Sequence, residues 1–76
     1  MSKSGEVLKR VLAEYGISQS DLARAMGTRR SSIHNWVSGR TDPGSDTMLE
    51  IRDALEKINP VAAEEFMRSW LDKSDS

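Results

Sequence analysis

Hydrophobic residues recur at spacings of three and four along most of this chain, which is the period of an amphipathic helix. In residues 6–15, EVLKRVLAEY, the apolar side chains fall on one face, and a glycine follows at the point where such a helix would end. Polar turn residues separate each apolar stretch from the next. The pattern predicts helices at about 5–15, 18–26, 29–38, 46–58 and 60–72, with a polar tail at 73–76.

The ends of the second and third helices carry recognisable capping residues. Ser18 and Asp21 have the spacing of a capping box at the start of the second helix. Gly27 is expected to adopt the left-handed conformation that ends this helix. Thr28 is then expected to be the N-cap of the third helix.

Turn-forming and capping residues also mark the later joints between helices. Residues 40–46, RTDPGSD, contain a Pro-Gly pair and predict a loop, after which Ser45 or Asp46 is expected to cap the fourth helix. Asn59 followed by Pro60 predicts an N-cap and a first helical residue for the fifth helix. Short helices with short joints predict one all-α domain over residues 1–76, a compact five-helix bundle.

Composition narrows the setting of this domain. The chain has 76 residues, no cysteine and one histidine, so it has neither a disulfide nor a thiolate zinc site. No apolar run approaches the ~20 residues that a membrane-spanning helix needs, and the start, MSKSGEVLKR, lacks a signal-peptide hydrophobic segment. These features lead us to expect a soluble, cytoplasmic protein with no membrane association.

The formal net charge of −1 conceals an uneven distribution of charge. Residues 1–40 hold seven Lys/Arg and three Asp/Glu, a net charge of +4, whereas residues 41–76 hold four and nine, a net charge of −5. One interpretation is that the first half meets a polyanion. The other is an ordinary solvated surface, and charge alone does not decide between them.

Residues 27–40, GTRRSSIHNWVSGR, concentrate cations and small hydrogen-bonding side chains. If the apolar residues of this segment face the core, a helical turn of 100° per residue brings polar side chains to the opposite face. The outward residues are then Ser31, His34, Asn35 and Ser38, with Arg30 at the helix start. Such a row of donors and acceptors suits the edges of base pairs in a major groove.

Two arginines stand where helix stability alone would favour acids. Arg29 and Arg30 lie at the start of the predicted third helix, where positive charge opposes the macrodipole. This position favours a partner that supplies anions. The alternative is that both are simply solvated, because the penalty at an exposed site is at most about 1 kcal/mol.

Residues 17–55 resemble the Cro/repressor-type (XRE-like) helix-turn-helix family. The positions that carry the resemblance are Gln19, Leu22, Ala23, Gly27, Ile33, Trp36, Gly39, Arg40 and Pro43, continued by Thr47, Leu49, Ile51 and Leu55. The resemblance implies a fold of the lambda-repressor-like DNA-binding type, with the helix-turn-helix formed by the second and third helices. It also implies a sequence-specific regulator of transcription, here expected to be a repressor that binds double-stranded DNA.

The same resemblance implies a role for individual side chains. Base edges would be met by Arg30, Ser31 and Asn35, with His34 beside them. The DNA backbone would be met by Gln19, Arg29, Ser38 and Arg40, and the charge distribution adds Lys9 and Arg10. One recognition helix reads few base pairs, so we expect a homodimer at least on DNA.

Two features depart from the family pattern. Val37 stands where an acidic residue often precedes the Ser38–Gly39 turn, and the last helix is unusually aromatic. Its Phe66, Met67 and Trp70 are expected to form a surface for a dimer or another protein. An antitoxin-like or other protein-interaction subunit on the same scaffold is therefore the alternative function.

Catalysis and metal binding find little support in the sequence. His34 and the serines beside it lack a partner that would orient a base or a nucleophile. The acidic residues of the second half have the spacing of exposed helix faces, and they are Glu50, Asp53, Glu56, Glu64 and Glu65. We expect no enzyme, no metal site and no cofactor.

Overall fold

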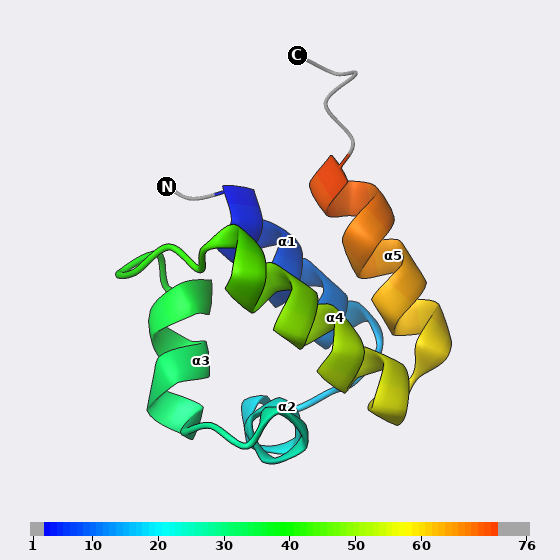
Figure 1. Ribbon diagram of the computed structural model, residues 1–76, viewed down its shortest axis with the longest axis horizontal. Coiled ribbons are helices and arrows are strands. Elements are labelled where there is room, and N and C mark those ends of the chain that lie inside the picture. The colour runs from blue at the N-terminus through cyan, green and yellow to red at the C-terminus, as the bar shows by residue number, and fades with distance from the viewer. Residues whose placement is uncertain (1–2, 72–76) are drawn as a thin grey trace.

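The computed structural model of the protein describes residues 3–71, with side chains from Ser4 onward, and consists of five helices over that range (Figure 1). They are α1 (Lys3–Glu14), α2 (Gln19–Met26), α3 (Arg30–Val37), α4 (Ser45–Ile58) and α5 (Pro60–Leu71). The prediction of an all-α, five-helix fold is confirmed. The predicted tail at 73–76 lies outside the described residues.

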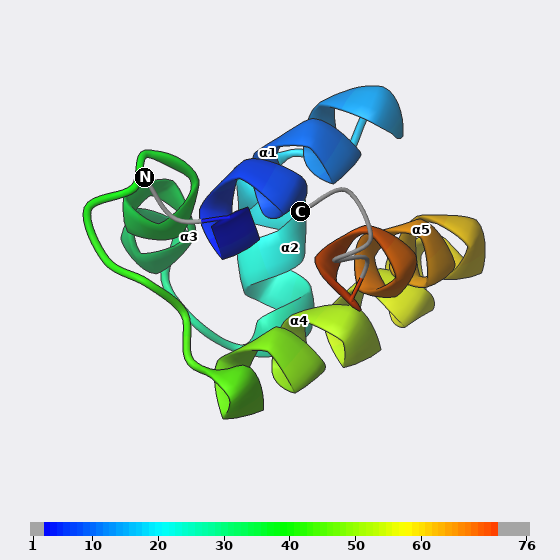
Figure 2. The ribbon, with the colours of Figure 1, turned by 90° about the horizontal axis from the view of Figure 1, so that it is seen from above.

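The helices pack so that α3 and α5 lie at opposite ends of the molecule. Helices α1 and α4 overlap in Figure 1, but Figure 2 shows α1 above and α4 below. Helix α2 packs against α3 and α4, while α5 packs against α1 and α4. Helix α3 contacts only α1 and α2 extensively, so much of its surface stays available. The whole measures 33 × 27 × 22 Å.

Every helix contributes to one apolar core. The largest fully buried side chains are Leu8, Val11, Leu22, Ile33, Met48, Ile51, Leu55 and Phe66. No polar or charged residue is buried among those that the structure describes. The polar residues of α3 are therefore not part of the core and lie at or near the surface.

The aromatic residues of α5 correct one expectation. Phe66 is fully buried, so the prediction that it forms a partner surface is wrong. The reason is that α5 packs against both α1 and α4, and Phe66 belongs to the core cluster that these helices share. Met67 and Trp70 are half-buried against the same core.

Two predicted caps are also corrected. Arg29, not Thr28, is the N-cap of α3, and its side chain makes no capping hydrogen bond. Thr28 is already used by the preceding turn, because its N–H donates to the carbonyl of Ala23 at 3.0 Å. Gly44, not Ser45 or Asp46, is the N-cap of α4.

Two other predicted caps form, although the Asp21 side chain accepts from Arg24 Nη1 and does not complete the capping box with Ser18. The amide of Asp21 donates to Ser18 Oγ at 2.9 Å at the start of α2. The amide of Val61 donates to Asn59 Oδ1 at 3.0 Å, and Pro60 is the first residue of α5. These caps fix where α2 and α5 begin.

Candidate nucleic-acid interface

The turn between α2 and α3 is built by one glycine and one small residue. Gly27 has a φ of 74°, and its N–H donates to the carbonyls of Ala23 and Arg24. Residues with a side chain rarely adopt this left-handed conformation, so glycine suits the position. Ala23 is buried, which lets α3 cross α2 closely. Helix α3 is thereby set at the end of the molecule (Figure 1).

A second turn closes the other end of α3. The N–H groups of Arg40 and Thr41 both donate to the carbonyl of Asn35, at 2.9 and 3.3 Å. Ser38 Oγ donates to the same carbonyl at 3.3 Å. Gly39, with a φ of 83°, makes the reversal possible. These bonds hold Arg40 beside the last turn of α3.

The outward face of α3 carries the side chains predicted for it. Arg30, Ser31 and His34 are exposed and Asn35 is half-buried, while Ile33 points into the core. Together with Gln19 at the start of α2, the three exposed residues line an open hollow of about 270 Å³. The structure therefore brings Gln19 together with three of the predicted base-reading residues.

A neighbouring hollow of about 240 Å³ extends this surface toward α1. Lys9 and Gln19 line it together with apolar residues that include Ala13 and Val37. Gln19 thus borders both hollows. Sequence reasoning did not select Ala13, although its place four residues after Lys9 puts both on one side of α1.

The cations around α3 have no acidic partner. Among the side chains that the structure describes, none of Lys9, Arg29, Arg30 and Arg40 forms an ion pair. No acidic residue stands in the first turn of α3 either. The free N–H groups of that turn add their own partial positive charge. The cations around α3 are therefore free to bind an external anion.

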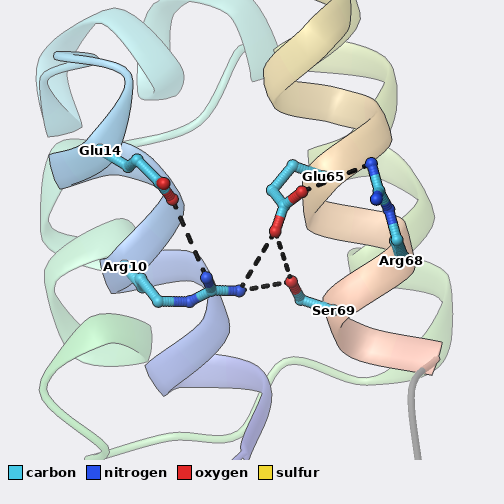
Figure 3. A network of polar contacts seen from close by, with 5 residues as sticks. All are labelled: Arg10, Glu14, Glu65, Arg68 and Ser69. Carbon is cyan, nitrogen blue, oxygen red and sulfur yellow. Dashed lines mark hydrogen bonds and ion pairs between the residues drawn. The ribbon is translucent and has the colours of Figure 1, made fainter.

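Arg10 lies elsewhere, although it was predicted to contact DNA. Its Nη2 is 3.6 Å from Glu65 Oε2 and also donates to Ser69 Oγ, both on α5 (Figure 3). Its Nη1 is 3.8 Å from Glu14 Oε1. Arg68 approaches the other oxygen of Glu65 at 3.5 Å. This network joins α1 to α5, so the structure does not bring Arg10 to the surface around α3.

Two other kinds of site are absent from the described range. No group of three or more His, Cys, Asp or Glu side chains there could hold a metal ion. None of the helices within residues 3–71 has the length and apolar character to cross a membrane.

Comparison of the sequence with known proteins gives two matches. Residues 8–60 match the helix-turn-helix family. Over 56 residues, 74% of this chain, the sequence is 38% identical to an uncharacterized HTH-type transcriptional regulator of Archaeoglobus fulgidus. The aligned part is 24% of that relative, so the chain spans about a quarter of its length. No solved structure matches the chain.

Proposed function

Because the chain belongs to the helix-turn-helix family, we propose that it is a sequence-specific regulator of transcription that reads the major groove of double-stranded DNA with α3. The observation that carries this proposal is the exposed polar face of α3, framed by cations without acidic partners. A duplex supplies both complements, base-pair edges for the polar face and phosphates for the cations.

Four residues of α3 have the placement and chemistry to read bases. Arg30 can donate two hydrogen bonds to guanine O6 and N7, and Asn35 can pair with adenine N6 and N7. Ser31 and His34 are exposed between them on the helix. In this proposal Arg30, Ser31, His34 and Asn35 face the base edges.

The DNA backbone is assigned to residues around this row. Gln19 and Lys9 border one hollow at the start of α2 and can donate to a phosphate there. Arg29 precedes α3, and Ser38 and Arg40 follow it. Arg10 is left out of the proposal because its guanidinium is engaged with α5.

The regulator would act as a repressor by occupying its site as a homodimer on a two-fold operator. Apolar side chains at the surface of α4 and α5 support contact with another protein chain. Val61 is 58% exposed, Leu71 61% and Leu49 43%. The same observation favours the second candidate function, an antitoxin-like or other protein-interaction subunit.

Selection of bound duplexes from a random pool, repeated at several salt concentrations, tests the proposal. We expect one enriched sequence whose binding weakens steeply with salt, because phosphate contacts release counterions. The variant Arg68→Ala, which removes a positive charge on α5, should enrich the same sequence. Failure to enrich any sequence would favour the protein-interaction function instead.

A further inference from the structure

The hollow of about 240 Å³ beside α1 lies where three helices meet. Its lining residues are Lys9, Leu12 and Ala13 of α1, Ile17 of the following turn, Gln19 of α2 and Val37 of α3. Leu12, Ile17 and Val37 belong to the apolar core or pack against it, so its inner wall is made of carbon. An engineered cavity of about 150 Å³ with apolar walls binds benzene in another protein. This hollow is therefore large enough for a six-membered ring.

Two polar side chains border the apolar wall, and both can donate hydrogen bonds. Lys9 forms no ion pair among the described residues, and the side chain of Gln19 forms no hydrogen bond there. None of the acidic residues that the structure describes lines the hollow. A cation and an amide beside a carbon wall complement a ligand with an apolar body and a carboxylate.

We propose that this hollow binds a small apolar carboxylate, with benzoate as its simplest representative. In this proposal the ring packs on Leu12, Ile17 and Val37, and the carboxylate lies between Lys9 and Gln19. These two polar residues are also the ones assigned above to a DNA phosphate, so ligand and duplex compete for the same donors. Binding in the hollow needs only its geometry and charge, whereas this competition rests on the proposed function.

Three probes test the binding to the free protein, followed by the NMR shifts of its amides at constant ionic strength. Benzamide has the shape of benzoate without the charge, and acetate has the charge without the ring. We expect saturable benzoate shifts around Ala13, Ile17 and Val37, with a Kd on the order of 1 mM, which is ordinary for so small a ligand. Benzamide should bind about two- to fivefold more weakly, the effect of one exposed charge pair, and acetate should not saturate.

The shift map also contains the outcomes that overturn the proposal. Benzoate shifts confined to the groove between α4 and α5, which Ala63 and Met67 line, would place the ligand elsewhere. Benzamide that binds as tightly as benzoate would contradict recognition of the carboxylate. No saturable shift with benzoate would contradict the site itself.

Two substitutions of Ala13 separate charge from space. Ala13 is exposed, and glutamate and glutamine both favour helix, so both variants should fold. Ala13→Glu puts a carboxylate four residues after Lys9, where it can pair with that cation, and should abolish the preference for benzoate over benzamide. Ala13→Gln has nearly the same size and should keep it. Equal preferences in the two variants overturn the proposal.

A second pair of variants makes the charge test independent of the space in the hollow. Lys9→Gln should lose the preference for benzoate over benzamide, because it removes the cation and leaves the apolar wall intact. Lys57→Gln removes an exposed lysine of α4 that does not line the hollow, so it should keep the preference. A Lys9→Gln protein with the full preference contradicts the proposal, even if both variants of Ala13 fail to bind either ligand.

The competition with DNA is measured on the duplex enriched by selection. Benzoate at about ten times its Kd should weaken binding of this duplex by between about twofold and elevenfold, the upper value being strict competition. Acetate at the same concentration is the control for salt, and equal effects of the two contradict the competition. The two hypotheses fail differently. No enriched duplex contradicts DNA reading, whereas an enriched duplex with no benzoate shifts contradicts only the ligand site.

Discussion

At the scale of single residues, the arginines fall into two groups, those with a carboxylate nearby and those without one. Arg24, Arg52 and Arg68 each lie within 4 Å of a carboxylate on their own helix, at 3.4, 2.9 and 3.5 Å. Arg29 and Arg40 have no such partner in the described residues, and both flank α3. A guanidinium without an internal partner can bind a phosphate without first giving up an ion pair.

This division predicts which arginines affect the salt dependence of DNA binding. Arg40→Ala should make the slope of log K against log[salt] shallower by about 0.9, the effect of one lost phosphate contact. Arg68→Ala and Arg10→Ala should leave the slope unchanged. Binding to one duplex is measured from about 50 to 200 mM salt, the range in which such slopes develop. An unchanged slope for Arg40→Ala would remove this residue from the interface.

Helical period predicted most of the outward row of α3: Ser31, His34 and Ser38 are exposed, whereas Asn35 is half-buried. With Ile33, Trp36 and Val37 packed on the core, Ser31 and His34 lie on the other side of the helix, and both are exposed. The same reasoning could not predict where the side chain of Arg10 points. Its partner Ser69 comes 59 residues later in the chain, so the direction of its side chain depends on where α5 packs.

At the scale of helices, the hydrophobic period predicts which residues of a helix are buried. It does not predict how many other helices pack against them. Helix α5 packs against both α1 and α4, which draws Phe66 fully inside. The sequence shows an excess of aromatic residues without showing this second neighbour. For α3 the error was smaller: Thr28 has good capping chemistry, but its N–H completes the Gly27 turn, and α3 begins one residue later.

The burial of Phe66 predicts a large effect on folding. Phe66→Ala should lower the free energy of unfolding by about 3–5 kcal/mol, the usual cost of such a cavity. That is a large part of the stability of a small domain, so the cooperative transition could disappear altogether. Val61→Ala, at an exposed site on the same helix, should cost no more than about 0.5 kcal/mol. Urea denaturation followed by circular dichroism measures both, and equal effects would contradict the assigned burial.

At the scale of the whole molecule, α3, the proposed recognition helix, is a short helix at one end. Its eight residues span about 12 Å, which is only three or four base pairs. The molecule, α3 included, measures 33 Å along its longest axis, and the other helices lie to one side of α3 (Figure 1). Useful specificity therefore needs a second copy about one helical turn away, ~34 Å along the duplex.

We accordingly predict two protomers per operator. Analytical sedimentation of the free protein and of its complex with the enriched duplex gives the stoichiometry directly. The enriched sequence should itself have two related half-sites, since operator symmetry follows protein symmetry. One protomer per duplex at saturation would contradict the homodimer and leave a single reading helix.

We propose above that α3 reads sequence and does more than attract phosphate. Arg30→Ala and Arg29→Ala each remove one unpaired guanidinium at neighbouring positions, so they are matched in charge and place. Parallel titration of both variants against the enriched duplex and a scrambled duplex is the most direct test. Arg30→Ala should weaken the enriched duplex by about 1–3 kcal/mol more than the scrambled one, whereas Arg29→Ala should weaken both about equally. An equal loss on both duplexes for Arg30→Ala would make Arg30 a phosphate ligand and contradict base reading by this residue.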